Sequence, residues 1–178
     1  MTCIVGVVEG DKVFIGGDSA GVSGWDMTVR ADQKVFRNGP MVFGFTSSLR
    51  MGQILRYALS IPEHDPCVSL DKYMVTTFID AVRECLKAKG FAKKTNEQEE
   101  GGIFLVGYKG RLFKIEADYQ VGITSRGYEA AGCGQAYALG VLYATPKLKA
   151  RARVALALKA AEDGSAGVRA PFHIEESA

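Results

Sequence analysis

Short apolar runs separated by turns dominate the first part of the sequence and predict two hairpins. Apolar residues fill positions 3–8 and resume at 13–15 after a polar turn that contains glycine. A second pair of runs, at 34–36 and 41–45, flanks the turn residues Asn, Gly and Pro. Between the two hairpins, 19–32 is polar and rich in glycine, which predicts a loop.

Helical periodicity follows in two segments. Residues 48–59 and 69–89 carry apolar side chains three or four positions apart, which is typical of amphipathic helices. Ser48 and Ser69 are suitable N-caps for them. The charged segment 91–100 that follows predicts a solvated loop.

The second half of the chain repeats this order of strands and then helices. Apolar runs separated by turn residues predict strands, and two periodic segments divided by a proline predict helices. A short apolar tail predicts an edge strand. In chain order these are strands at 103–108, 112–116 and 120–124, helices at 135–145 and 148–162, and the tail at 171–174.

This order predicts a fold class. Strands and helices come in blocks and do not alternate strictly, so we expect an α+β protein with antiparallel sheets. Two sheets packed face to face, with a pair of helices on each outer side, would bury every apolar face. The prediction is therefore a four-layer αββα sandwich, formed as one domain over residues 1–178.

Composition narrows the classes of function. The net charge of +2 is too close to neutral to indicate a nucleic-acid-binding protein, and the 47% hydrophobic and 24% charged residues are typical of a globular domain. No apolar run approaches the ~20 residues of a membrane span. The start of the sequence does not have the pattern of a secretory signal, and the four cysteines have no CxxC spacing. We therefore expect a cytoplasmic protein with reduced thiols.

Three residues form a candidate catalytic group. Asp18 stands sixteen positions after Thr2, and Lys34 stands sixteen positions after Asp18. The predicted hairpin starts beside Thr2 and ends at Asp18, so the two residues should lie close together. A third strand paired alongside the hairpin would bring Lys34 to the same corner.

This trio fits catalysis by an N-terminal nucleophile. Methionine aminopeptidases usually remove an initiator Met that precedes a small residue, which would leave Thr2 with a free amine and a hydroxyl. An α-amine has a pKa of about 8 and can accept the hydroxyl proton, so that Oγ attacks a carbonyl carbon. A Lys34 ammonium would stabilise the developing alkoxide, and an Asp18 carboxylate would keep Lys34 charged and oriented.

The same residues resemble those of a known family. The Thr2, Asp18 and Lys34 spacing is similar to that of proteasome β-subunits, and most of all to that of the bacterial HslV peptidases of the same N-terminal nucleophile (Ntn) hydrolase superfamily. Further resemblance extends over nearly the whole chain, at 41–45 (MVFGF), 130–138 (AAGCGQAYA) and 160–167 (AAEDGSAG).

The resemblance implies a threonine endopeptidase that hydrolyses peptide bonds through an acyl-enzyme on Thr2. It also assigns further site residues. The backbone N–H of Ser47 aligns with the oxyanion donor, which is usually a glycine in the family. Cys133 stands where the family has a supporting serine, Glu162 where it has an aspartate, and Ser165 is retained. Ser165 and Glu162 would support the amine.

The resemblance also implies partners. These are unfolded protein or peptide substrates, further copies of the chain in homo-oligomeric rings, and, as a candidate, an ATP-dependent AAA+ unfoldase. We expect no cofactor. We also expect no metal, because the spacing of His64, Cys67 and Cys85 fits no set of ligands.

Two other functions stay open. If Met1 is retained, the nitrogen of Thr2 is an amide and cannot act as a base, so the chain would be an inactive ring protein with the same fold. Alternatively, the chain could be an Ntn amidase that acts on a small amide. Enzymes of that kind more often use Cys or Ser, and the spacing to Lys34 favours the peptidase.

Two rival motifs are weaker. Cys3 could act as an N-terminal nucleophile only if Thr2 were also removed, so a buried strand thiol is the preferred interpretation. The Gly132-Cys133-Gly134 segment begins like a dinucleotide-binding fingerprint, but Tyr137 occupies the place of the third glycine, and we reject that interpretation.

Overall fold

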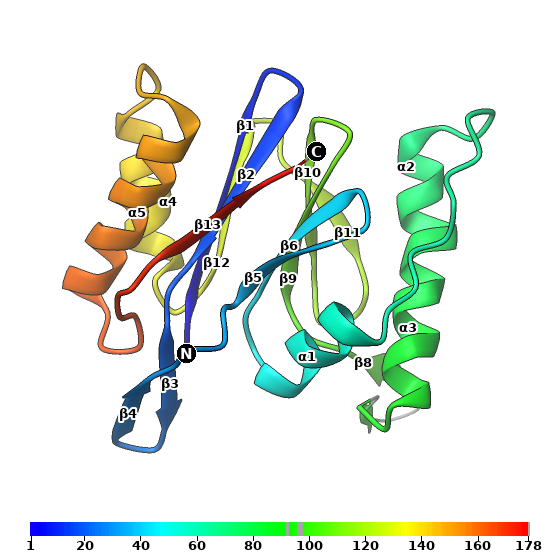
Figure 1. The fold of residues 1–178 in the computed structure, drawn as a ribbon, viewed down its shortest axis with the longest axis horizontal. Helices are drawn as coiled ribbons and strands as arrows, with labels where there is room; N and C mark the ends of the chain where they lie inside the picture. The colour runs from blue at the N-terminus through cyan, green and yellow to red at the C-terminus, as the bar shows by residue number, and fades with distance from the viewer. Residues whose placement is uncertain (92, 96–97, 178) are drawn as a thin grey trace.

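The computed structural model describes residues 1–91, 93–95 and 98–177 and shows two antiparallel sheets that lie face to face (Figure 1). The four-stranded sheet has the order β12 (Tyr128–Gly132), β1 (Cys3–Glu9), β2 (Lys12–Gly17) and β13 (His173–Glu176). The five-stranded sheet has the order β11 (Val121–Ile123), β10 (Arg111–Ile115), β9 (Phe104–Tyr108), β6 (Met41–Phe45) and β5 (Val35–Asn38).

Helices cover the outer face of each sheet (Figure 1). The four-stranded sheet carries α4 (Gln135–Ala144) and α5 (Ala150–Gly164). The other sheet carries α1 (Leu49–Tyr57), the short α2 (Leu70–Tyr73), a π-helical turn (Met74–Phe78) and α3 (Ile79–Ala88). The predicted α+β sandwich of four layers is confirmed. None of the helices in the described part of the chain is both long and apolar enough to cross a membrane.

Burial on both faces explains the apolar strand sequences. Along β1, Ile4 packs between the two sheets, whereas Val5 and Val7 pack against the α4/α5 layer. A strand covered on both sides needs apolar residues at successive positions, which produces a continuous run instead of alternation. The predicted edge strand at the C-terminus is β13, which pairs with β2.

Two segments predicted as loops contain strands. Residues 19–32 form a hairpin of β3 (Ala20–Ser23) and β4 (Asp26–Val29), which projects beside the N-terminus with Trp25 fully exposed at its turn (Figure 1). Every residue of β4 is exposed, so no apolar alternation marks it in the sequence. Within 91–100, the described residues include the paired strands β7 (Lys93–Thr95) and β8 (Gln98–Glu100). Positions 92 and 96–97 of that predicted loop lie outside the described residues.

Candidate active site

The topology brings the start of the chain to the end of two neighbouring strands. Cys3 lies opposite Gly132 at the end of β12, and Ile4 lies opposite Gly17 at the end of β2. Thr2 and Asp18 therefore meet at one edge of the sandwich, as the hairpin predicts. The Cys3 N–H donates to Asp18 Oδ1 at 2.9 Å, which fixes the carboxylate beside the chain start.

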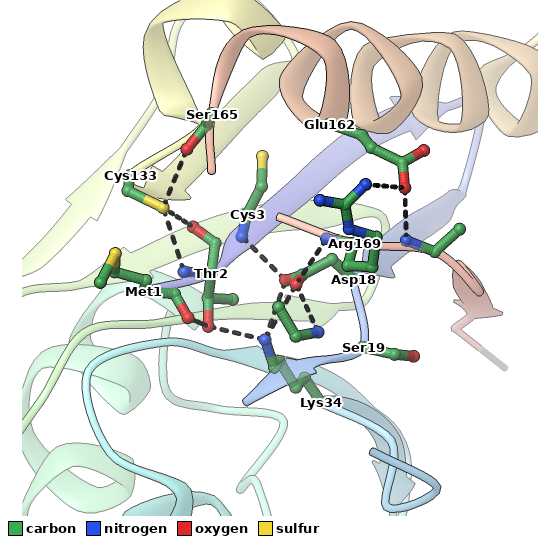
Figure 2. A network of polar contacts seen from close by, with 12 residues as sticks. Met1, Thr2, Cys3, Asp18, Ser19, Lys34, Cys133, Glu162, Ser165 and Arg169 are labelled. Atoms are coloured by element: carbon green, nitrogen blue, oxygen red, sulfur yellow. Dashed lines mark hydrogen bonds and ion pairs between the residues drawn. The ribbon is translucent and has the colours of Figure 1, made fainter. Parts of the chain in front are cut away.

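Lys34 reaches the same corner by a route that differs from the prediction. The expectation that its strand pairs alongside the hairpin is wrong, because β13 occupies that edge of β2. Lys34 directly precedes β5 of the facing sheet and extends across the space between the sheets. Its Nζ lies 2.9 Å from Thr2 Oγ1 and 3.0 and 3.1 Å from the two Asp18 oxygens (Figure 2).

Lys34 and Asp18 form an almost fully buried pair. Only 2% of the surface of Lys34 is exposed, and 0% of that of Asp18. The backbone N–H groups of Ala20 and Arg169 donate to Asp18 Oδ2 at 2.8 and 3.3 Å, in addition to the Cys3 N–H on Oδ1. Burial lowers the pKa of Lys34, and the Asp18 carboxylate opposes this shift. A buried ion pair is tolerated when further hydrogen bonds satisfy its atoms, as they do for Asp18.

Cys133 lies next to the backbone nitrogen of Thr2, and Ser165 lies next to Cys133 (Figure 2). The Thr2 N–H donates to Cys133 Sγ at 3.3 Å, and the thiol lies 3.4 Å from the Thr2 carbonyl oxygen. Ser165 Oγ donates to Cys133 Sγ at 3.3 Å. Ser165 therefore reaches Thr2 through the thiol, in a chain of two contacts.

Glu162 contacts the chain at Arg169 and Ala170. Its Oε1 accepts the Ala170 N–H at 2.9 Å and lies 4.0 Å from Nη1 of Arg169 (Figure 2). These contacts hold the segment that also supplies the Arg169 N–H to Asp18. The geometry gives Glu162 a place in supporting Asp18, whereas the resemblance implies direct support of the amine.

Ser47 lies just after β6 in a left-handed conformation with a φ of 70°. The Ser48 N–H donates back to the Thr46 carbonyl at 2.8 Å, which forms a γ-turn around Ser47. Ser47 Oγ accepts the Ile103 N–H at 3.1 Å, whereas the Ser47 N–H has no acceptor within the described part of the chain. Ser47 and Thr2 both line a pocket of about 380 Å³.

Met1 engages the hydroxyl that would act as the nucleophile. Thr2 Oγ1 donates to the Met1 carbonyl oxygen, and Met1 is among the residues that line the pocket. While Met1 is present, the nitrogen of Thr2 is an amide and has no lone pair to accept a proton. Removal of Met1 would free the hydroxyl and create the amine at the same point.

Comparison with known proteins places this arrangement in a known fold. No protein family model and no curated protein matches the sequence. Thiobacillus denitrificans BPH, solved in complex with epoxomicin, has a TM-score of 0.80 at 22% identity over 98% of this chain and 97% of that one. Eukaryotic HslV from Trypanosoma brucei has a TM-score of 0.70 at 19% identity over 98% of both chains. Anbu (ancestral beta-subunit) from Yersinia bercovieri has a TM-score of 0.67 at 15% identity over 98% of this chain and 81% of that one.

The chain has the HslV-like fold. It is the Ntn hydrolase fold that the resemblance implies, with two antiparallel sheets between helices. At these low identities the likeness establishes the fold alone.

Within the HslV-like fold, some contacts at the site are made by the backbone, so the type of residue in the sequence does not predict them. Ala20 and Arg169 contribute through their backbone N–H groups, which every residue except proline has. Gly132 has a φ of 99°, and a side chain there would overlap the Thr2 carbonyl oxygen. The glycine is visible in the sequence, but its contact with Thr2 depends on the register of β12 with β1.

The environment of Cys3 favours the interpretation as a buried thiol. Its side chain is fully buried among the residues under the α4/α5 layer. Burial, together with the nearby Asp18 carboxylate, raises the pKa of the Cys3 thiol to about 12. The thiolate, which is the reactive form, is therefore scarce at neutral pH.

Proposed function

We propose that this protein is a threonine peptidase whose nucleophile is Thr2 after removal of Met1. One observation carries the proposal: the buried Lys34 ammonium lies 2.9 Å from Thr2 Oγ1 while Asp18 holds it from the other side. A fixed positive charge at this distance stabilises an alkoxide far better than water does, because it needs no reorganisation during the reaction.

The residues support a two-step reaction. The free α-amine of Thr2 accepts the Oγ proton, Oγ attacks the peptide carbonyl carbon, and the oxyanion accepts the N–H of Ser47. Transfer of the proton from the α-ammonium to the leaving amine breaks the peptide bond and leaves an ester on Oγ. Water, deprotonated by the same amine, then hydrolyses the ester and restores Thr2.

The contacts of the Thr2 nitrogen suit an amine that acts as a base. Cys133 is its neighbour, and Ser165 orients the thiol. A thiol is a weak hydrogen-bond group and leaves the amine lone pair available. A bound metal or cofactor has no role in this sequence of steps.

Covalent labelling tests the proposal. A peptide epoxyketone such as epoxomicin, which stands in complex with BPH of the same fold, needs both the hydroxyl and the amine of one N-terminal residue. We expect intact-mass spectrometry to show a chain without Met1 and, after incubation, the addition of one inhibitor. Peptide mapping should place the inhibitor on Thr2.

Two controls separate the alternatives. A chain with an uncleaved N-terminal extension keeps Met1 and should not be labelled, and neither should Thr2→Ala. Labelling of Thr2→Ala would refute the assignment. A natural chain that keeps Met1 and stays unlabelled would support the inactive ring protein, and labelling without hydrolysis of any peptide would favour the amidase.

We also propose that the protein works as a homo-oligomer, with α4 and α5 in contact with another copy. The exposed positions of α4 carry no charge, whereas α3 on the opposite side of the molecule exposes Asp80, Glu84 and Lys87. A helix whose outer face lacks polar residues is usually covered. The exposed α4 residues are Ala136, Tyr137, Gly140, Tyr143 and Ala144.

The outer side of α5 exposes charges of both signs, Arg151 and Lys159 with Asp163, so α5 would lie at the polar rim of such an interface. Rings and an unfoldase partner remain expectations from the resemblance.

A pair of matched variants tests this interface. Tyr143 in α4 and Tyr57 in α1 are 77% and 78% exposed, so both can be replaced without disturbing the core. Light scattering should give an oligomer for the wild type, a smaller species for Tyr143→Glu and an unchanged oligomer for Tyr57→Glu. A monomeric wild type, or equal masses for both variants, would contradict the proposal.

A further inference from the structure

The pocket beside Thr2 contains one charged side chain in a position that is unfavourable for it. The pocket lies between the start of β3 and the start of α1, and the side chains around it are mostly small, apolar or hydroxylic. Arg50 is the only charged side chain among its described lining residues. Arg50 stands in the first turn of α1, where the helix dipole disfavours a cation and favours an anion.

Nothing in the described part of the chain compensates this charge. The first turn of α1 contains no acidic residue. Some arginines have carboxylate partners, as in Arg30 with Asp32 and Arg111 with Asp71, whereas Arg50 is among those that no ion pair of the described residues includes. An unpaired cation at the wrong end of a helix, on the wall of a pocket that holds the nucleophile, points to an anion supplied from outside.

We propose that Arg50 selects peptide substrates that carry an acidic side chain, Asp or Glu, next to the bond that Thr2 cleaves. Thr2 and Arg50 line the same space, so a side chain next to the bond that Thr2 attacks can reach Arg50 in this pocket. Its volume of about 380 Å³ lies within the range of small ligand pockets, about 300–1,000 Å³. A guanidinium binds a carboxylate through two parallel N–H groups, which a neutral amide cannot match.

This inference rests on the proposed function and names its substrate class. The test uses the Met1-free wild-type protein and fluorogenic peptide amides that are identical except at the residue before the cleaved bond, which is Glu, Gln, Tyr or Arg. Gln has the shape of Glu without its charge. We expect kcat/KM for Glu to exceed that for Gln about ten-fold, the size of one charge-assisted hydrogen bond in an open pocket, and to fall towards the Gln value at high ionic strength.

Variants assign the preference to Arg50. In Arg50→Gln the Glu-to-Gln ratio should fall to about one, and in Arg50→Glu it should fall below one, with the Arg peptide now preferred. Arg56→Gln is the matched control, since Arg56 lies in the last turn of the same helix over the Phe36 ring and does not line the pocket. Because each ratio is measured within one variant, partial loss of folded protein does not change it.

A further arm distinguishes the source of the carboxylate. Peptides that end one residue after the cleaved bond are compared as free acid and as amide. A preference for the free acid, without a preference for Glu over Gln, would overturn the acidic side chain as the ligand. Equal cleavage of Glu and Gln peptides by an enzyme that epoxomicin labels would overturn this inference alone. No cleavage and no labelling would overturn the proposed function and this inference with it.

Discussion

Replacing Lys34 by methionine is expected to abolish peptide hydrolysis while the protein still folds. The Nζ of Lys34 is the cation that contacts Thr2 Oγ1, and methionine has a similar length but no charge and no donor. Loss of a single preorganised electrostatic contact in an active site typically costs about 10²–10³ in kcat. Because the proposed function makes Thr2 Oγ1 the attacking atom, we expect the upper end of this range or more.

The fold should survive because Asp18 keeps its other partners. Removing one member of a buried ion pair usually lowers the free energy of unfolding by about 3–5 kcal/mol, because a charge is left unpaired. That loss is about the full stability of a marginal domain. Here three backbone N–H groups, from Cys3, Ala20 and Arg169, still donate to the carboxylate. A double variant, Lys34→Met with Asp18→Asn, removes the buried charge altogether and provides a second inactive protein.

The measurement combines kcat/KM for a fluorogenic peptide with thermal unfolding followed by circular dichroism. Lys12→Met is the control, since Lys12 also pairs with a carboxylate but lies on the surface, with its side chain 48% exposed beside Glu176. It should change neither quantity appreciably. A folded Lys34→Met that hydrolyses peptides within ten-fold of the wild-type rate would rule out an electrostatic role for Lys34.

The routes by which Asp18 and Lys34 reach Thr2 show how far the sequence could predict this site. The Asp18 position follows from one hairpin, which is a local feature with clear turn residues. The Lys34 position depends on which sheets face each other, and the sequence of β5 and β6 specifies a hairpin without specifying the sheet that it joins. The spacing of Thr2, Asp18 and Lys34 therefore indicated residues that the structure brings together, although the predicted path for Lys34 was wrong.

There are also physical reasons why the sequence did not predict some strands and one pocket residue. The hairpin of β3 and β4 projects away from the core, so no burial imposes alternation on its side chains. The β12 sequence YEAAG has two alanines and a glycine, which are poor strand formers, and it becomes a strand because it pairs with β1. Arg50 on an exposed helix face resembles any solvated arginine until the pocket beside it is known.

Replacing Gly132 by alanine is expected to give the largest loss of stability among single-methyl additions at the site, and to displace Thr2. Two costs combine at this position. The φ of 99° is a conformation that residues with a side chain rarely adopt, and the added Cβ would overlap the Thr2 carbonyl oxygen. Relief of that overlap requires β12 and the start of β1 to separate, so Thr2, the proposed nucleophile, moves away from Lys34.

Gly127→Ala isolates the first cost, the positive φ. Gly127 also has a positive φ, of 70°, but no atom lies within 4 Å of the position of an added Cβ. Its replacement should cost only about 1–2 kcal/mol, the conformational part, and leave catalysis unchanged. Gly132→Ala should cost at least about 4 kcal/mol, which is exceptional for one methyl group. Denaturant unfolding and epoxomicin labelling measure the two effects, and equal unfolding free energies with normal labelling of both variants would show that the backbone of β12 does not set the position of Thr2.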